Sequence, residues 1–179
     1  MNPCYLKLLS KITLAGLGLS LAACAKTEGP ASGGSGIVAS LEAISYEVGS
    51  CFGFCPVYSA SISYDGAVQF DGIRHTATIG QQTSVKDART YRAFADAFAA
   101  FRPTEGTTSS TSCDTRISDQ QHYRITWTSA DGGKTVLEHD RGCRSPKNDQ
   151  LNAVLQRAPD ILGIAELAKQ TTRPGVSRG

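Results

Sequence analysis

Residues 58–63 and 68–70 show the strict alternation of apolar and polar side chains that is typical of half-buried β-strands. A two-residue turn between them would mix the apolar and polar faces. A three-residue loop that ends at Gly66 keeps the apolar side chains together and gives Gly66 the left-handed position that such a loop requires. The pattern therefore predicts an antiparallel hairpin. Its expected pairs are Ile62 with Val68 and Ala60 with Phe70.

The same pattern recurs in residues 123–128 and 135–139, which a three-residue loop ending at Gly132 can join. This loop predicts a second antiparallel hairpin, again with a left-handed glycine. Its expected pairs are Tyr123 with His139, Ile125 with Leu137 and Trp127 with Thr135. A further strand is expected over residues 41–48.

Helical periodicity separates the two hairpins. Four aromatic residues recur at helical spacing, and such a stripe is typical of a helix face that packs on a core rather than of a ligand groove. They are Tyr91, Phe94, Phe98 and Phe101. Ser84 and Asp87 resemble a capping box and predict the start of this helix, and Arg102-Pro103 predicts its end.

A second helix is predicted to begin at Ser145-Pro146, because an N-cap serine precedes a proline at the first helical position. Its apolar face is expected to consist of Leu151, Val154, Leu155 and Ala158. Pro159 is expected to break this helix, and residues 161–168 to form a last short one.

The order of strands, helix, strands and helix predicts an α+β fold. We expect a mainly antiparallel sheet of two hairpins, with two to three helices packed on one face. One domain is expected over residues 37–168, followed by a disordered tail over 169–179. The polar loop 104–112 is the expected place for insertions.

The first 24 residues have the features of an export signal. Lys7 and Lys11 precede an apolar run from Ile12 to Leu21, which is too short to span a bilayer comfortably. Leu-Ala-Ala then precedes Cys24, and this arrangement resembles the bacterial lipobox, in which a lipidated cysteine becomes the first mature residue. We therefore expect residues 1–23 to be a signal peptide and Cys24 to carry palmitate or related acyl chains.

The same resemblance implies a location in the bacterial cell envelope. Several acyl chains anchor a protein far more firmly than one. Ala25, rather than aspartate, follows Cys24, and this favours the outer membrane, with the domain facing the periplasm. Residues 24–36 are mostly small and polar, and they predict a flexible tether with a reach of roughly 20 Å.

Charge narrows the range of partners. The whole chain has 18 Lys and Arg residues and 16 Asp and Glu residues. Removal of the signal peptide takes away Lys7 and Lys11 and no acid, so the mature chain is neutral. A neutral chain with scattered charge lacks the electrostatic footprint of a nucleic-acid binder. The expected partners are therefore the membrane, through the lipid on Cys24, and an unknown envelope protein or ligand.

The cysteines indicate disulfides. Of six cysteines, Cys4 would leave with the signal peptide and Cys24 would take the lipid. An even number remains, which in an exported domain favours disulfide bonds. Four cysteines allow three pairings, and the strand pattern places two pairs locally. The favoured pairs are Cys51 with Cys55 and Cys113 with Cys143.

The run from Cys51 to Tyr58 (Cys-Phe-Gly-Phe-Cys-Pro-Val-Tyr) is the sharpest local motif. An alternating strand follows it, then Asp65-Gly66 and an aromatic strand with Gly72. Together these residues resemble an uncharacterised family of bacterial lipoproteins and secreted proteins, known as a domain of unknown function. The resemblance covers roughly residues 40–165. It implies a fold and a location, and it brings no catalytic residue.

Two interpretations are open for Cys51 and Cys55. In the first, their disulfide pinches a structural turn in which Gly53 allows the tight backbone and Pro56 fixes the exit into a strand. In the second, the thiols bind copper or exchange electrons, because Cys-x-x-x-Cys-Pro also occurs in copper-delivery proteins and soft sulfur suits Cu(I). The third ligand would be His139, His122 or His75. A helix follows the motif in those proteins, whereas a strand is expected here. His139 is expected to be a hydrogen-bonded residue of the sheet.

The sequence contains no nucleophile-elbow, zinc-protease or phosphate-loop motif, and it assigns no catalytic residue and no cofactor. It favours a non-catalytic binding or interaction module that is held near the membrane. One alternative is a thiol-redox or copper-binding protein that uses Cys51 and Cys55. Another is a structural protein of the envelope without a ligand.

Overall fold

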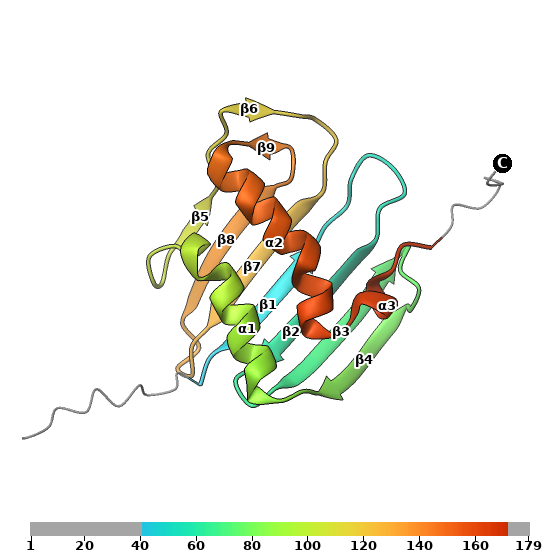
Figure 1. Cartoon of the computed structure of the whole chain (residues 1–179), viewed down its shortest axis with the longest axis vertical. Helices are drawn as coiled ribbons and strands as arrows, with labels where there is room; N and C mark the ends of the chain where they lie inside the picture. The colour runs from blue at the N-terminus through green and yellow to red at the C-terminus, as the bar shows by residue number, and fades with distance from the viewer. Residues whose placement is uncertain (1–40, 172–179) are drawn as a thin grey trace, which may run out of the picture. The chain divides into compact units, whose positions relative to one another are not determined.

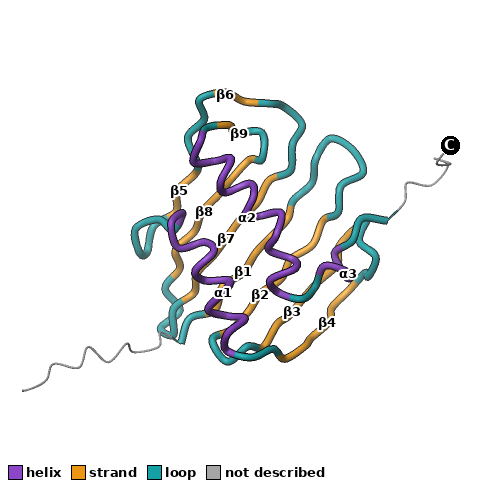
Figure 2. Tube along the Cα trace, viewed as in Figure 1, coloured by secondary structure: helices purple, strands orange, loops and turns teal. Residues whose placement is uncertain are grey.

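The computed structural model describes residues 41–171, in which helices cover one face of a large, antiparallel-dominated sheet (Figure 1, Figure 2). The α+β class is therefore confirmed. The expected signal peptide, Cys24, the tether and residues 172–179 of the expected tail lie outside the described residues. Within them, no helix is long and apolar enough to cross a membrane.

Seven strands form the main sheet, in the order β4-β3-β2-β1-β7-β8-β5, and β6 and β9 pair separately. The strands are β1 (Ala43–Val48), β2 (Val57–Ser63), β3 (Ala67–Arg74), β4 (Gly80–Val85), β5 (Thr108–Ser110), β6 (Thr115–Arg116), β7 (His122–Thr128), β8 (Lys134–Asp140) and β9 (Cys143–Arg144). The helical elements are α1 (Ala88–Phe98), the 3₁₀ turn η1 (Ala99–Phe101), α2 (Pro146–Leu162) and α3 (Ala165–Ala168). All neighbouring strands of the main sheet are antiparallel except β5 and β8, which are parallel.

Both hairpins have the register that their sequences predict. In the β2–β3 hairpin Ile62 pairs with Val68, and in the β7–β8 hairpin Ile125 pairs with Leu137. Gly66 and Gly132 have φ values of 90° and 86°, so each occupies the left-handed position that a three-residue loop needs. The alternating pattern alone was enough to fix these pairings, because a one-residue slip would turn every apolar side chain to the wrong face.

The two-hairpin description of the sheet was incomplete. β1 lies between the hairpins and pairs with both β2 and β7, and β4 and β5 add the two edges. β4 escaped prediction because all its residues after Gly80 are exposed on both faces, which leaves no apolar alternation to recognise. The capping-box prediction was also wrong. Ser84 belongs to β4, and the N-cap of α1 is Asp87, whose carboxylate accepts from Thr90 N at 3.0 Å.

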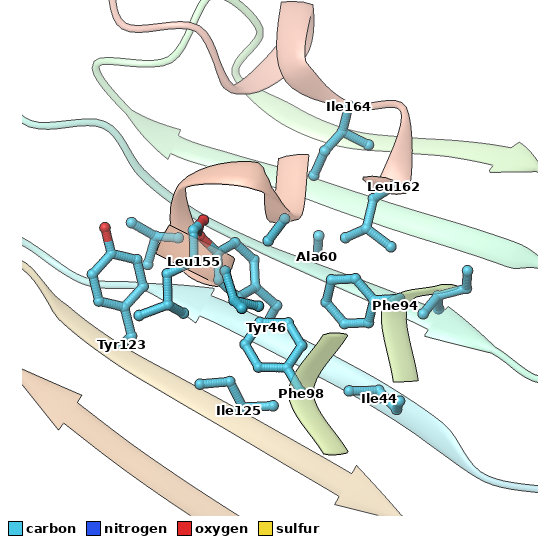
Figure 3. Packing of buried hydrophobic residues seen from close by; sticks show 14 of the residues in the cluster. Ile44, Tyr46, Ala60, Phe94, Phe98, Tyr123, Ile125, Leu155, Leu162 and Ile164 are labelled. Carbon is cyan, nitrogen blue, oxygen red and sulfur yellow. Dashed lines mark hydrogen bonds between the residues drawn. The ribbon is translucent and has the colours of Figure 1, made fainter. Parts of the chain in front are cut away.

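The core fills the space between the sheet and the helices (Figure 3). α1 contributes Phe94 and Phe98, which are fully buried, while Tyr91 and Phe101 pack at its margin. The aromatic stripe is therefore core, as its spacing predicted. The other large buried side chains come from both hairpins, β1 and α2. They include Ile44, Tyr46, Ile62, Phe70, Ile125, Trp127, Leu151, Leu155 and Leu162.

α2 begins as predicted, with Ser145 Oγ accepting from Asn148 N at 3.1 Å. The expectation that Pro159 breaks it was wrong, since the helix continues to Leu162 and ends at Gly163, which is left-handed. A proline inside a helix leaves the carbonyl four residues earlier without its usual N–H donor. That carbonyl belongs to Leu155, and the buried hydroxyl of Tyr46 donates to it at 3.0 Å. A strand of the sheet therefore replaces the bond that Pro159 removes.

The C-terminal part of the described chain crosses towards the β3–β4 connection. The predicted helix over 161–168 is divided between the end of α2 and α3. Beyond α3, the chain hydrogen-bonds to residues 75–78, with Ala77 N donating to Lys169 O and Thr171 N donating to His75 O. Residues 169–171, which the sequence assigns to the unpatterned tail, are thus hydrogen-bonded to the β3–β4 connection in the structure.

One ion pair is buried at the opposite end of the core. Glu42 precedes β1 and is 4% exposed, and its carboxylate accepts two hydrogen bonds from the Arg102 guanidinium, at 3.1 and 2.6 Å. The guanidinium also lies 5.4 Å from the ring centre of Trp127. This bidentate contact joins the end of η1 to β1, across 60 residues of sequence.

Candidate binding surface

The face of the sheet opposite the helices is open to solvent, and we call it the open face. Residues that alternate with the buried core positions point to it from β1, β2, β3 and β7. Because the helices cover only one side (Figure 1), this face is polar where the other is apolar.

A row of short side chains crosses the middle of the open face. Ser61 pairs with Ser45, and Ser45 pairs with Thr126 across the next strand boundary. Gln69 extends the row onto β3. Hydroxyl side chains are small and can both donate and accept hydrogen bonds. This row therefore forms a low, hydrogen-bonding floor.

The neighbouring row carries charge. In register across the strands it contains Asp71, Ser59, Glu47, Arg124 and Glu138. Arg124 and Glu138 form an ion pair of 2.6 Å, and Ser110 Oγ donates to the same carboxylate at 3.3 Å. Since neighbouring strands are about 4.8 Å apart, the row from Asp71 to Glu138 extends roughly 20 Å.

Two hollows lie along these rows, and they share Glu47, Ser59 and Ile73. The first hollow, of about 520 Å³, extends from these residues towards β7, β8 and the Cys113–Cys143 disulfide. The second hollow, of about 510 Å³, extends towards β3 and β4. Ile73, which is 58% exposed, supplies an apolar patch where the two hollows meet. Their joint lining offers hydroxyls, carboxylates, the guanidinium groups of Arg116 and Arg124, and a few aliphatic side chains.

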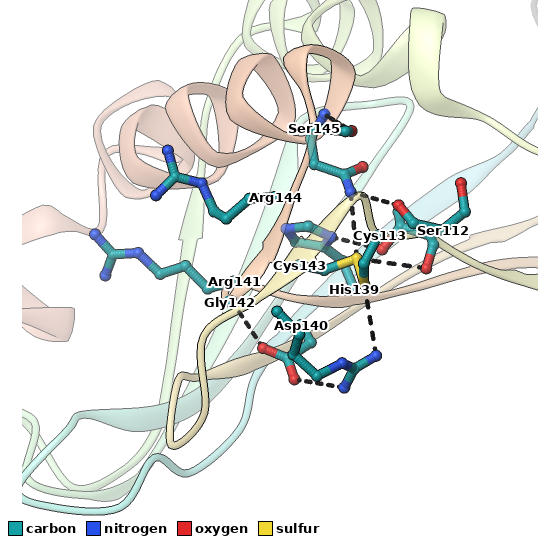
Figure 4. The surroundings of a disulfide bond; sticks show 12 residues. Ser112, Cys113, His139, Asp140, Arg141, Gly142, Cys143, Arg144 and Ser145 are labelled. Atoms are coloured by element: carbon teal, nitrogen blue, oxygen red, sulfur yellow. Dashed lines mark hydrogen bonds and ion pairs between the residues drawn. A yellow bond between two sulfur atoms is a disulfide. The ribbon is translucent and has the colours of Figure 1, made fainter.

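Cys143 lines the far end of the first hollow and is bonded to Cys113. Figure 4 shows the surroundings of this disulfide. The short β6–β9 pairing brings the two cysteines together, with Arg116 opposite Cys143. Arg116 also forms an ion pair of 3.2 Å with Asp140, which lines the hollow. Asn148 of α2 donates to Ser112 O at 2.8 Å and to Cys143 Sγ at 3.3 Å. These bonds join α2, the disulfide and the end of the sheet to one another.

His139 is a hydrogen-bonded residue of the sheet, as expected. Its ring lies on the helix side, where Nδ1 is 2.8 Å from Thr111 Oγ1 and Nε2 is 3.0 Å from Asn152 Oδ1. Burial lowers the pKa of His139, with Asn152 and Asp140 acting in the opposite direction. The environment thus favours the neutral ring, which connects β8 to α2.

The Cys51–Cys55 disulfide pinches the turn between β1 and β2. β2 follows it directly, so the residues after the motif are a strand and not a helix. The side-chain amide of Gln121 donates to Gly49 O at 3.3 Å and to Pro56 O at 2.8 Å, on both sides of the turn. Phe54 packs against His75, with ring centres 3.8 Å apart. Phe52, by contrast, is 87% exposed.

The candidate ligand set for a metal is dispersed in the structure. Cys51 and Cys55 form a disulfide with each other, and both ring nitrogens of His139 are hydrogen-bonded, to Thr111 and Asn152. Among residues 41–171, no group of three His, Cys, Asp or Glu side chains is placed to hold a metal ion. His122 lies on the first hollow, with Nδ1 3.9 Å from an Asp140 oxygen.

A family model described as a domain of unknown function, DUF6438, matches residues 42–162. The chain belongs to this family. The DUF6438 match begins just before β1 and ends at the last residue of α2, so it contains all seven strands of the main sheet and both long helices. It also contains the open face and all four cysteines of the two disulfides. No curated protein matches the chain.

Several residues that build this region carry no local signal in the sequence. Gln121, Asn148 and Asn152 are polar residues in polar stretches, and only their tertiary contacts show what they hold. The open face could have been anticipated in part. The serines that alternate with Tyr58, Ala60 and Ile62 mark one polar face, but their neighbours on β1 and β7 depend on the strand order.

Proposed function

We propose that this chain is a lipid-anchored protein of the bacterial envelope whose domain is a non-catalytic binding module, with the open face as its binding surface. The observation that carries the proposal is the pair of hollows that meet at Glu47, Ser59 and Ile73 on that face. Concave surfaces with convergent polar groups and some apolar lining are the usual places where proteins bind ligands. The ligand we propose is an extended polar segment presented by an envelope partner.

The chemistry of the face supports an extended ligand. The hydroxyl row offers donors and acceptors along several strands, and the charged row runs parallel to it. Short side chains lose little conformational freedom on binding, and Arg124 is already held by Glu138. A surface that is ordered before binding loses less free energy when the ligand arrives.

The location rests on the N-terminal sequence. Lys7 and Lys11, the apolar run and Leu-Ala-Ala before Cys24 support lipidation, and Ala25 supports the outer membrane. A tether of roughly 20 Å would hold the domain close to the membrane surface, which raises its effective concentration towards envelope partners.

Replacement of Cys24 by serine is expected to release the chain from the membrane. A serine cannot receive the thioether-linked lipid, and the acyl chains provide the anchorage. Fractionation of cells that produce the full chain would test this, with Cys4→Ser as the matched control, because Cys4 precedes the expected cleavage point. The anchoring proposal fails if the serine variant stays in the membrane fraction as the unchanged chain does.

The Ser59→Lys variant is expected to lose binding at the open face by at least about tenfold. Lysine fills the place where the two hollows meet, and Glu47 and Asp71 on either side accommodate its charge. Ala93→Lys is the matched control, since Ala93 is exposed on α1. Cross-linking in intact cells, followed by mass spectrometry of the cross-linked sites, gives the readout. Equal cross-linking by wild type and Ser59→Lys, or cross-links confined to the helices, would contradict the proposal.

A further inference from the structure

β4 is an unprotected edge of the main sheet. It stands at one end of the strand order, and its six residues, Gly-Gln-Gln-Thr-Ser-Val, include no charge and no proline. It pairs with β3 without any shift of register. Natural sheets usually blunt their edges with charged residues, proline, bulges or very short strands, because a bare edge pairs with other strands. β4 uses none of these devices.

Within residues 41–171, the backbone of β4 has pairing groups at alternate residues that no other strand uses. Lys86 N donates to Gly66 O at 2.8 Å, so the pair that continues the β3–β4 register is a hydrogen-bonded one. Hydrogen-bonded and non-hydrogen-bonded pairs alternate along an antiparallel ladder. The N–H and C=O groups of Gln81, Thr83 and Val85 therefore point away from β3, towards the outside of the sheet.

The geometry excludes two other occupants within the described chain. β5, at the opposite edge, has three residues and is too short to pair with β4 along its length. The C-terminal segment runs antiparallel to residues 75–78, with Leu167 bonded to Thr78 and Thr171 bonded to His75. It therefore leads away from β4, which begins at Gly80. A second copy of β4 is the strand of matching length and polarity.

We propose that β4 pairs antiparallel with β4 of a second copy of the chain, around a two-fold axis at Gln82. In this register Gln81 lies opposite Thr83 of the second copy, so the outward backbone groups of both strands meet. Val85 then lies opposite Ile79, and these apolar side chains are 81% and 62% exposed in one copy. Such a contact is isologous and closes after two copies. It joins the two sheets edge to edge, with both open faces on one side.

Engineered cysteines test the register directly. In this dimer Gln82 meets its own counterpart in a non-hydrogen-bonded pair, where Cα atoms are about 4.5 Å apart, within the range of a disulfide. Ser84 would be roughly 13 Å from its counterpart, which is too far. We expect Gln82→Cys in the full chain to form a disulfide-linked dimer on mild oxidation with diamide, at least about ten times more than Ser84→Cys does. Equal cross-linking of the two variants would overturn the proposal.

A second pair of variants tests the dimer without a cross-link. Thr83→Lys places a charge at the edge, near its counterpart across the axis, and is expected to give monomers. Gln69→Lys is the matched control, because Gln69 pairs with Thr83 from β3 on the same face but lies one strand inside the edge. Sedimentation of the full chain in detergent should show a dimer for the wild type and Gln69→Lys. A wild-type monomer over the whole concentration range, or a dimer that Thr83→Lys leaves intact, would refute the pairing.

Discussion

Replacement of both Cys113 and Cys143 by alanine is expected to lower the free energy of unfolding by about 3–4 kcal/mol. The disulfide closes a loop with a sequence separation of 30 residues, and its loss lets the unfolded chain explore many more conformations. Alanine is the suitable replacement because Cys143 is 1% exposed, and a small apolar side chain leaves no unpaired hydroxyl there. Urea unfolding followed by the fluorescence of Trp127, the sole tryptophan of the chain, would measure the change.

The second disulfide provides the comparison. Cys51 and Cys55 are only four positions apart, so their replacement by alanine should cost about 2 kcal/mol. Loss of the Cys113–Cys143 disulfide should also alter the first hollow, because Asn148 contacts both Cys143 and Ser112 beside Cys113. Loss of the Cys51–Cys55 disulfide, which closes the short loop, should destabilise the domain less than loss of Cys113–Cys143. If the two losses were equal, chain entropy would not be the main contribution of these disulfides.

Replacement of Tyr46 by phenylalanine is expected to cost about 2 kcal/mol. The Tyr46 hydroxyl is the donor to Leu155 O, and without it a buried carbonyl in α2 loses its partner. Burial and the neighbouring phenols of Tyr58 and Tyr123 raise the pKa of Tyr46, so its hydroxyl stays protonated and can donate. Urea unfolding would measure the loss.

The cause can be separated from a general effect of the substitution by a double-mutant cycle. In a Pro159→Ala background, the new N–H at position 159 can donate to Leu155 O, so Tyr46→Phe should then cost less by about 1 kcal/mol or more. Tyr123→Phe is the matched control, because the Tyr123 hydroxyl donates to Gln121 and its cost should not depend on position 159. An equal cost of Tyr46→Phe in both backgrounds would show that the hydroxyl does not replace the missing helix bond.

Local patterns in the sequence predicted the parts of the fold that are stabilised locally. The alternation in residues 58–70 and 123–139 and the position of Gly66 and Gly132 were sufficient for both hairpin registers. Ser145-Pro146 marked the start of α2. Each of these features depends on interactions between residues a few positions apart, so the local sequence is enough to predict it.

The predictions were wrong where contacts between distant parts of the chain determine the local structure. β4 forms by pairing with the edge of β3, and both of its faces are exposed. Its sequence therefore has no alternation of apolar and polar residues that would predict a strand. Pro159 was expected to end α2, but Tyr46, more than 100 residues away in sequence, supplies the missing donor. The ion pair of Glu42 and Arg102 likewise joins two residues with no local signal that they meet.

The candidate site shows the same division. The sequence by itself predicted the pairs Cys51–Cys55 and Cys113–Cys143, the shared face of the β2 serines, and the α+β class of the fold. Only the tertiary structure decided that β1 lies between the hairpins, which places Glu47 between Ser59 and Arg124 and brings the two hollows together. The reason is physical: side-chain alternation is a property of one strand, whereas a binding surface depends on which strands are neighbours. Strand order is set by the packing of a whole core, to which distant segments contribute at once.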